Sequence, residues 1–550
     1  MKKNEIVSGK VIRTDFPDKG YVQIKDEDGE HVMTVKGVLP GQEILARVIK
    51  RRFNRDTHKE RLEGRLERVV KQAPDSVLSL CPHFGECGGC AYLNLPYEKA
   101  AALKEEQVKR LLAPVWQSSE QARIPVWDDL QVSPEAFGYR NKMEFTFGDA
   151  YKGGPLTLGM HKLEHFHDIV SVEGCQIVDA DYRLILRTTL SFFSPLYEKG
   201  QVSFYNRMQK RGYLRHLLIR KGIHAGEILI DLITTSQMPK QTRDLKNADM
   251  KETETSTNQF EVATVPLSSN SIGVGFESEK LMSATEILKE YKNALLAISS
   301  LLNSNIIGIL HTTNDAEADA VIDQGTEILY GRDSFEETLL GITFTVTPFS
   351  FFQTNSGGAE VLYSKVREYC AQALGEQKVG TIYDLYCGTG TITQLMANYA
   401  SKVVGVEIVP EAVKAARINA EKNGITNAVF LCGDVLKEIE NLDETPDLMI
   451  LDPPRDGIHP KALPKLIDFK AKHIIYVSCK PTSLARDLPY ILARGYICKR
   501  ITCVDQFPWT RHVETVCLLS NRKPDSYVHL NLKMEDYYRI KDAQKEQDKK

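Results

Sequence analysis

Three cysteines lie within ten residues of one another, at Cys81, Cys87 and Cys90. Two adjacent glycines separate the last two, and such crowding of thiols in a reducing compartment indicates a metal site far more often than chance. Zinc and an iron–sulfur cluster both fit three thiols. A fourth ligand must come from elsewhere, and Cys175 is the nearest cysteine in sequence. The five-residue gap after Cys81 is not the spacing of radical-generating clusters, so no radical chemistry is expected.

A second group of residues is typical of a ligand-binding turn. The run 381–391 combines an apolar strand, a turn containing Gly388 and Gly390, and the start of a helix. The third glycine of the dinucleotide fingerprint is absent, which argues against NAD or FAD. The next predicted strand ends in Glu407, where a carboxylate can bind ribose hydroxyls, and a third ends at Asp434, which could reach an adenine amino group. A sheet with these features resembles that of the S-adenosylmethionine-dependent methyltransferases.

A further cysteine, Cys479, directly follows a predicted strand. A thiolate there could add to C6 of uracil, which makes C5 nucleophilic toward a sulfonium methyl group, and could later be eliminated. A base must then remove the C5 proton, and Glu514 is the candidate. Asp452 begins an Asp-Pro-Pro-Arg turn at the mouth of the predicted site. Arg455 stands where amino-group methyltransferases have an aromatic residue and RNA cytosine enzymes a second cysteine, so uracil is favoured.

The elements that must position these residues alternate between strand and helix from about 341 to 520. The clearest strands are 381–385, 403–406, 429–431, 448–451 and 474–477. This alternation predicts an α/β fold with a parallel, doubly wound, Rossmann-like sheet whose site lies at the carboxyl ends of the strands. Pro410 begins a predicted helix that ends near Gly424.

The residues before 341 predict two further domains. Short strand-like runs at 7–12, 21–24, 31–35 and 43–49 predict an OB-like barrel over residues 1–70. The barrel leads into a strip rich in Arg and Lys, between Arg47 and Lys71, which is either a solvated charged face or a phosphate-binding surface. Residues 71–340 predict a central α+β domain. A stretch at about 237–271, poor in large apolar residues, is expected to be a mobile insertion, and the polar tail 523–550 is expected to fray.

Together these motifs resemble the RNA 5-methyluridine (uracil-C5) methyltransferases, and most closely the 23S ribosomal RNA branch with a TRAM domain and a [4Fe-4S] cluster. The resemblance covers nearly all of residues 1–520. It implies that the barrel is a TRAM domain that binds RNA, with the methyltransferase domain at 341–522. It also implies that the central domain carries the cluster, held by Cys81, Cys87, Cys90 and Cys175.

The same resemblance implies the roles of the site residues. Cys479 would be the nucleophile and Glu514 the base. Contacts to S-adenosyl-L-methionine would come from Gln353, Tyr386, Glu407 and Asp452, with Gly388, Gly390, Thr391 and Asp434 in the same site. The segment 138–142 matches the family's RNA-facing motif, which assigns RNA contacts to Tyr139, Arg140, Asn141 and Lys142. One departure is Lys480, where the family usually has Asn; its ammonium could help to lower the pKa of the neighbouring thiol.

Two alternatives remain beside a 23S rRNA substrate. The first is methylation of the T-loop uridine of tRNA, although that branch typically lacks both the cluster and the TRAM domain. The second is an RNA-binding iron–sulfur module whose methyltransferase domain is inactive, in which case Cys479→Ala would leave the biological role intact.

The composition is that of a globular protein. The chain has 550 residues, 11 scattered cysteines and a net charge of -3, so an RNA partner must be bound by a local basic patch. The start of the sequence has no apolar segment typical of a signal peptide, and its apolar runs are too short for a membrane helix. We therefore expect a cytoplasmic protein without membrane association, and expect it to be a monomer.

Overall fold

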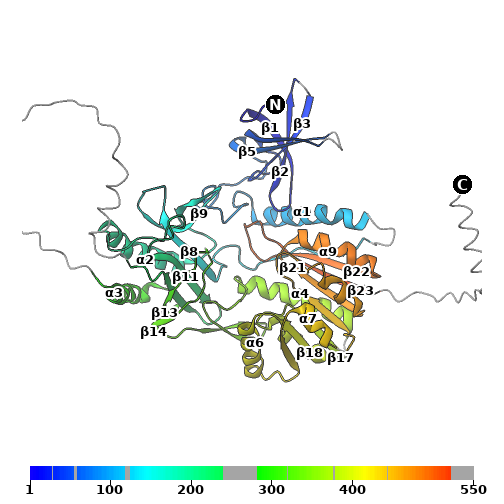
Figure 1. Cartoon of the computed structure of the whole chain (residues 1–550). Helices are drawn as coiled ribbons and strands as arrows, with labels where there is room; N and C mark the ends of the chain where they lie inside the picture. The colour runs from blue at the N-terminus through cyan, green and yellow to red at the C-terminus, as the bar shows by residue number, and fades with distance from the viewer. Residues whose placement is uncertain are drawn as a thin grey trace, which may run out of the picture.

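The structure is a computed structural model that describes residues 1–27, 29–54, 59–117, 124–238, 282–318, 320–375, 378–442 and 444–521. Three sheets dominate it, and Figure 1 shows the first, a small barrel, standing above the other two. Nearly all of the expected insertion at 237–271 and the whole tail 523–550 lie outside the described residues. Within the described ranges, none of the helices combines the length and apolarity needed to cross a bilayer.

The barrel at the N-terminus is closed by five strands. They are β1 (Ile6–Asp15), β2 (Lys19–Asp26), β3 (Gly29–Val35), β4 (Glu43–Asn54) and β5 (Lys59–Lys71), in the spatial order β1-β2-β3-β5-β4. Alternating apolar residues such as Val22, Met33 and Ile44 fill its core. The predicted OB-like barrel is confirmed, but its fifth strand was not predicted; the basic strip between Arg47 and Lys71 spans the second half of β4 and β5.

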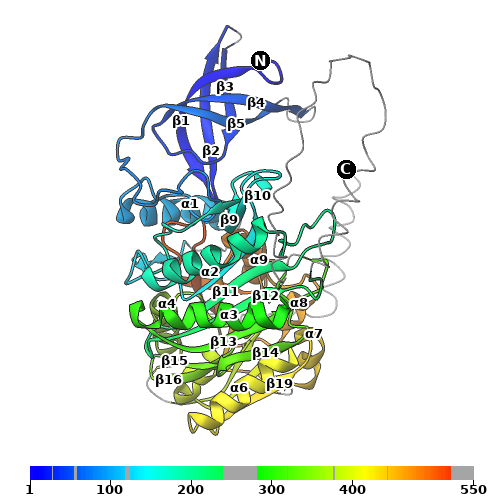
Figure 2. The same ribbon diagram turned by 90° about the vertical axis from the view of Figure 1, so that its left-hand side faces the viewer.

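The central domain is built on a seven-stranded sheet with the order β10-β9-β8-β11-β12-β13-β14. Its strands are β8 (Lys142–Asp149), β9 (Leu156–Lys162), β10 (His165–Ser171), β11 (Leu214–Gly222), β12 (Glu227–Thr234), β13 (Asn305–Thr313) and β14 (Thr326–Gly331). Helices α2 (Ala180–Glu198) and α3 (Ala284–Ala297) pack on one face of it (Figure 2). A hairpin of β15 (Phe335–Leu339) and β16 (Ile342–Val346) follows, and the expected boundary at 340/341 falls in its turn.

The third sheet has the predicted doubly wound arrangement. Its order is β19-β18-β17-β20-β21-β23-β22-β6, with β7 also paired to β22. The strands are β17 (Val379–Leu385), β18 (Ala400–Glu407), β19 (Ala428–Cys432), β20 (Leu448–Leu451), β21 (His473–Ser478), β22 (Tyr496–Asp505) and β23 (Glu514–Asn521). The first five in the spatial order are parallel, and β23 runs antiparallel between β21 and β22. The carboxyl ends of the parallel strands therefore meet at one edge, as predicted.

Helices cover both faces of this sheet. One face packs against α1 (Tyr97–Gln117), α8 (Ala462–Asp468) and α9 (Pro481–Ala493), and the other against α4 (Ser356–Leu374) and α5 (Thr391–Leu395). Helix α6 (Pro410–Lys422) packs on β18 and β19, beside the short α7 (Val435–Glu438), and single 3-10 turns lie at Ser299–Leu301, Ala397–Tyr399 and Ile439–Asn441. Consecutive strand residues alternate between the two faces, which explains the continuous apolar runs in the sequence.

A segment far away in sequence completes the edge of the third sheet. Strands β6 (Val126–Trp127) and β7 (Gln131–Val132) run parallel to β22 and pair with it, and α1 precedes them. Helix α1 lies directly beneath the barrel and contacts both α9 and β1 (Figures 1 and 2). The part of the chain from 97 to 132 therefore contributes structurally to the third sheet, although it precedes that sheet's first long strand by about 250 residues.

Candidate active site

The turn after β17 is built from residues with unusual backbone angles. Tyr386, Gly388 and Gly390 have φ values of 71°, 54° and 76°, which is the left-handed region. A Cβ atom at Gly390 would lie 2.6 Å from Cε1 of Phe430, so glycine is required there by space as well as by conformation. Thr391 follows as the first residue of α5 and is buried. The turn thus brings main-chain groups to the carboxyl edge of the sheet.

Glu407 closes this turn from the neighbouring strand. One of its carboxylate oxygens accepts the N–H of Gly388 at 3.1 Å, and the other accepts the N–H groups of Ile408 at 2.8 Å and Val409 at 3.0 Å. These bonds fix the carboxylate at the end of β18, which is the position that the sequence predicted for it. Asp434 lies at the start of α7, where its side chain accepts the N–H of Leu436 at 2.9 Å.

Tyr386 is close enough to Asp434 for the two to interact electrostatically. Burial, together with the negative charges of Asp434 and Asp487, raises the pKa of its hydroxyl to about 12. Asp434 therefore acts electrostatically on Tyr386, and Glu407 accepts the N–H of Gly388, two residues after that tyrosine. Tyr386, Glu407 and Asp434, three of the residues assigned to donor binding, therefore lie together at the carboxyl ends of neighbouring strands.

The loop before α4 contributes Gln353. Its side-chain oxygen accepts a hydrogen bond from Nε2 of Gln506 at 3.0 Å, and its amide also bonds the hydroxyl of Tyr363. Burial, together with the negative charges of Asp452 and Glu514, raises the pKa of the Tyr363 hydroxyl well above its ordinary value. Gln353 is thus placed at the same edge as the two strand-end acids.

Cys479 and Glu514 face each other across adjacent strands. Strands β21 and β23 are antiparallel, and their register pairs Ser478 with Thr515. The next residue of β21's segment is Cys479 and the preceding residue of β23's segment is Glu514, so these two continue the ladder at the sheet edge. Cys479 also precedes the N-terminus of α9, whose dipole favours an anion.

The electrostatics of this group are strongly perturbed. Burial, with the charges of Glu514 and Asp452, raises the pKa of the Cys479 thiol to about 12. Burial and Asp452 raise the pKa of Glu514 to about 8, and burial with Asp384 raises that of Asp452 to about 7. Arg455 opposes the shifts of Cys479 and Glu514. Thiol, carboxyls and guanidinium therefore form one interacting site, and its excess of buried acids suits a cationic ligand.

The loop that leads into Glu514 is anchored by a lysine from α1. The ammonium of Lys104 donates to Oδ1 of Asp505 at 2.6 Å and to the main-chain oxygens of Phe507 at 3.0 Å and His512 at 3.1 Å. The sequence reading missed Lys104. The signal was its position on the apolar stripe of α1, four residues from both Ala100 and Val108, where a charged side chain must have a buried partner.

The motif at 139–142 divides into buried and partly exposed residues. Tyr139 is 4% exposed and donates to the main-chain oxygen of Pro508 at 2.9 Å. Asn141 is 3% exposed, and its Nδ2 donates to the main-chain oxygen of Gln353 at 3.0 Å and to Oγ of Ser356 at 2.9 Å. The expectation that this motif faces RNA is therefore corrected for these two residues, which instead tie active-site loops together. Arg140 and Lys142 remain partly exposed.

The four cysteines assigned to the cluster come together from two segments. The other three thiols contribute to the raised pKa of Cys90, and Cys81 and Cys87 contribute to that of Cys175, which burial raises to about 11. Cys81 acts similarly on Cys87. All six pairs are thus within electrostatic range. In the described part of the chain, however, no three Cys, His, Asp or Glu side chains gather as closely as a single metal ion needs.

The segment that holds three of these thiols contacts the active-site loop. The main-chain N–H groups of Ala91 and Tyr92, directly after Cys90, donate to the main-chain oxygen of Trp509 at 2.8 and 3.1 Å. Trp509 lies in the loop between β22 and β23, five residues before Glu514, and its Nε1 donates to the main-chain oxygen of Ala136 at 2.7 Å. Main-chain hydrogen bonds from the two residues after the cysteine segment (residues 81–90) therefore join this segment to the loop that leads to Glu514, the candidate base.

Comparisons with known proteins agree with this geometry. A family model described as tRNA (Uracil-5-)-methyltransferase matches residues 322–522. An uncharacterized RNA methyltransferase of Clostridium tetani is 39% identical over 518 residues, covering 94% of this chain and 98% of that protein. Another, from Clostridium acetobutylicum, is 41% identical and covers 95% and 99%. The crystal structure of Pyrococcus abyssi tRNA (uracil-54, C5)-methyltransferase with S-adenosyl-L-homocysteine is 23% identical, with a TM-score of 0.61, and covers 93% and 100%. That last likeness concerns the fold.

Proposed function

The chain belongs to the RNA uracil-C5 methyltransferase family, and on that premise we propose that it methylates C5 of a uridine in RNA through a covalent adduct between Cys479 and C6. The observation that carries the proposal is the register of β21 and β23, which sets Cys479 against Glu514 at the carboxyl edge of a methyltransferase sheet. A nucleophile and a base at adjacent positions are what this reaction needs.

Several features of the site support S-adenosyl-L-methionine as the donor. Asp384, Asp452 and Glu514 are partly or fully buried carboxyls with raised pKa values, and a sulfonium cation would offset their mutual repulsion. When bound, the donor supplies an electrophilic methyl group. We assign its ribose to Glu407 and the remaining contacts to Gln353, Tyr386, Asp452, the turn at Gly388 and Gly390, and, at the periphery, Thr391 and Asp434.

In the proposed reaction, the Cys479 thiolate forms a bond to C6 of the uracil, and the electron pair of the C5=C6 bond moves toward O4. C5 then forms a bond to the methyl carbon as the carbon–sulfur bond of the donor breaks. Glu514 accepts the proton from C5. The resulting electron pair restores the C5=C6 bond and expels the Cys479 sulfur, so the enzyme regains its thiolate and the product is 5-methyluridine.

The target base must leave its stack to reach this edge, because neither C5 nor C6 can be attacked from the required direction inside a helix. Arg140, Lys142 and Arg455 are among the partly or fully exposed cations near the site, and we assign contacts with the RNA backbone to these three. The positive field of Arg455 at Cys479 and Glu514 also favours the thiolate and the carboxylate forms that the reaction uses.

We propose 23S ribosomal RNA as the substrate and keep the T-loop uridine of tRNA as the alternative. The barrel and the four converging cysteines support the rRNA branch. The tRNA alternative gains support from the Pyrococcus abyssi tRNA enzyme, whose fold matches this chain over the whole length of that enzyme. The presence of the barrel and the central domain therefore does not by itself favour rRNA over tRNA. We expect the protein to act as a monomer and to meet its RNA in the cytoplasm.

We further propose that Cys81, Cys87, Cys90 and Cys175 hold a [4Fe-4S] cluster. Four thiols are its usual ligand set, and a cluster of four irons holds its outer thiolates farther apart than one tetrahedral ion does. The support for this proposal is that the four thiols, from two segments of the chain, influence one another electrostatically. Anaerobic purification should give protein with iron and sulfide. Cys90→Ser should lose both, whereas Cys432→Ser, an exposed cysteine elsewhere, should retain them.

The central test uses methyl-labelled S-adenosyl-L-methionine with ribosomal and transfer RNA from cells that lack the enzyme. Mass spectrometry of RNA fragments should find label on C5 of a uridine with the wild-type protein and none with Cys479→Ala. The fragment identifies the substrate as rRNA or tRNA. A complete absence of label from anaerobically prepared wild-type protein would instead favour an RNA-binding module with an inactive methyltransferase domain.

A further inference from the structure

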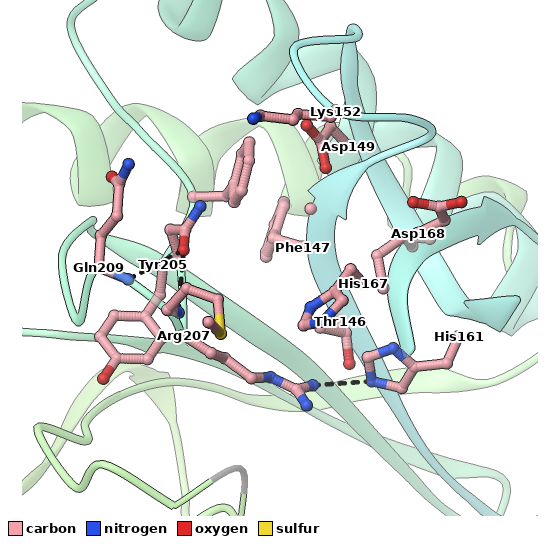
Figure 3. A pocket seen from close by; sticks show the side chains of 15 residues that line it. Thr146, Phe147, Asp149, Lys152, His161, His167, Asp168, Tyr205, Arg207 and Gln209 are labelled. Carbon is pink, nitrogen blue, oxygen red and sulfur yellow. Dashed lines mark hydrogen bonds between the residues drawn. The ribbon is translucent and has the colours of Figure 1, made fainter. Parts of the chain in front are cut away.

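A pocket of about 460 Å³ lies in the central domain, outside the site described above. It opens between strands β8 to β10 and the loop at 203–213, as Figure 3 shows. Its apolar walls are Phe147, Ile169 and Phe204, and Met208 stands at its rim with 79% of its surface exposed. The volume falls within the range of about 300–1,000 Å³ typical of small-ligand pockets.

The loop that forms one wall is held in place by its own hydrogen bonds. Main-chain bonds join Asn206 to Arg211 across the loop, at 2.7 Å in the shorter direction. The side-chain oxygen of Asn206 accepts the N–H groups of Met208 at 3.0 Å and Gln209 at 3.1 Å. Arg215 lies over the ring of Tyr205, 4.4 Å from its centre. Because the loop is ordered in this way, the pocket is formed before any ligand binds.

Polar groups surround the apolar walls. Arg207 bonds Nε2 of His161 at 2.8 Å, the dashed contact in Figure 3, and Lys152 projects at the opposite side. Two acids, Asp149 and Asp168, also line the pocket, and the carboxylate of Asp149 accepts the N–H of Gly153 at 2.7 Å. An isolated phosphate fits this mixture of charges poorly. A flat heterocycle with its own donors and acceptors fits it well, and the outer cations suit the phosphates on either side of it.

The pocket is connected to the active site through the cysteine segment. The main-chain oxygen of His161 accepts the N–H of Gly88 at 3.3 Å, and the N–H of Leu163 donates to the main-chain oxygen of Glu86 at 2.7 Å. The other end of that segment bonds Trp509, in the loop before Glu514. None of the residues that line the pocket belongs to the active site described above, so the pocket is a second site.

We propose that this pocket, with walls of Phe147 and Phe204 and with Arg207 at its rim, binds an unstacked base of the substrate RNA other than the methylated uridine. The inference rests on the proposed function, because it assigns the pocket to the same RNA strand. Binding of a second base would fix the register of the RNA, and so would determine which uridine reaches Cys479. The free energy of binding the second base should increase the affinity for RNA and should not change the rate of methyl transfer.

The test uses Met208→Asp, which places a negative charge at the rim without disturbing a buried contact. Its matched control is Leu301→Asp, because Leu301 is a similarly exposed apolar residue of the central domain, 68% exposed, outside the pocket. Fluorescence anisotropy with a labelled 12-nucleotide RNA of mixed sequence measures affinity. The charge should keep the base out of the pocket. Since stacking contributes about 1–3 kcal/mol per base, Met208→Asp should weaken binding by about 5- to 160-fold, and Leu301→Asp should leave it unchanged.

Two further measurements separate this proposal from the proposed function. Ultraviolet cross-linking of the same RNA to wild-type protein should label a peptide within 204–209. In methylation assays, Met208→Asp should raise KM for RNA and leave kcat unchanged. If wild-type protein methylates RNA but Met208→Asp binds and reacts like Leu301→Asp, the pocket proposal is overturned while the function stands. If RNA cross-links in the pocket but no uridine is methylated, the function fails and the pocket remains.

Discussion

Lys104 and Asp505 form an ion pair that joins helix α1, in the first quarter of the chain, to the end of β22. Their charged atoms lie 2.6 Å apart, the residues are separated by 401 positions in sequence, and their side chains are 1% and 0% exposed. Burial lowers the pKa of Lys104, and the field of Asp505 opposes that shift. The pair fixes the start of the loop that ends at Glu514, so the geometry of the base depends on a helix near the N-terminus.

Removing one partner of this pair should be strongly destabilising. Lys104→Met leaves Asp505 buried without its cation, which typically costs about 3–5 kcal/mol of unfolding free energy. Lys104→Met with Asp505→Leu should recover most of that stability, yet remain slow in methyl transfer because the oxygens of Phe507 and His512 lose their shared donor. Urea unfolding and single-turnover kinetics measure the two effects. Lys109→Met, which breaks a half-exposed pair on the same helix, should change stability by at most about 1 kcal/mol.

Glu514→Gln should stop the reaction after methyl transfer. The amide cannot accept the C5 proton, so the Cys479 adduct cannot be eliminated, and turnover should fall by about 10²- to 10⁴-fold. A denaturing gel with labelled RNA and labelled donor should show both labels migrating with the protein. The double variant Cys479→Ala with Glu514→Gln should show neither. An adduct that carried RNA without methyl label would place the role of Glu514 before methyl transfer.

Glu407→Gln should weaken donor binding. Its carboxylate is held by three main-chain N–H groups at the end of β18, and charged hydrogen bonds of this kind contribute about 1.5–3 kcal/mol. Calorimetry with S-adenosyl-L-methionine should therefore find an affinity lower by about 10- to 100-fold. Glu411→Gln, an exposed acid in the first turn of α6, is the control and should bind normally. Equal affinities for the two variants would remove Glu407 from the donor site.

The pH dependence of stability should reveal the buried carboxyl of Asp384. Burial raises its pKa to about 7, although a hydrogen bond from Thr393 at 2.6 Å partly stabilises the charged form. A carboxyl with a raised folded-state pKa binds more protons in the folded than in the unfolded protein. Its contribution therefore favours the folded state below about pH 4 and is lost as pH rises to about 7, by at most about 1.4 kcal/mol per pH unit.

Asp384→Asn removes this titration. Relative to the wild type, the variant should gain stability steadily between about pH 4 and pH 7, when urea unfolding is followed across that range. Thr393→Val, which removes the hydrogen bond but keeps the acid, should raise the pKa of Asp384 further and so extend the loss of stability to higher pH. A constant difference between Asp384→Asn and the wild type at all pH values would show that the carboxyl does not titrate in this range.

Much of the catalytic sheet could be predicted from the sequence, because fully buried parallel strands are continuous apolar runs. The runs at 381–385 and 474–477 lie within β17 and β21, and the acid Glu407 ends β18 as expected. The site residues at strand ends follow from this, since a parallel sheet brings its carboxyl ends to one edge. Local sequence and topology agree here.

Other parts depend on contacts that local sequence does not contain. Strand β5 mixes charged and apolar residues, so its Arg and Lys were interpreted as part of a charged strip. In the barrel some of them pair with acids, as Lys71 does with Glu43 at 3.6 Å. Strands β6 and β7 have two residues each, and they form only because they can pair with the edge of β22. The burial of Tyr139 and Asn141 likewise follows from loops that lie hundreds of residues away.

The insertion of β6 and β7 beside β22 has a consequence for synthesis on the ribosome. Residues 97–132 emerge early, but the strand they pair with ends at Asp505, so about 370 residues must be translated before their partner exists. The barrel can close soon after Lys71 has emerged, whereas the catalytic unit cannot be completed until nearly the whole chain is made. Premature termination anywhere before β22 and β23 should therefore leave α1 with an exposed apolar face, a state that chaperones bind and proteases remove.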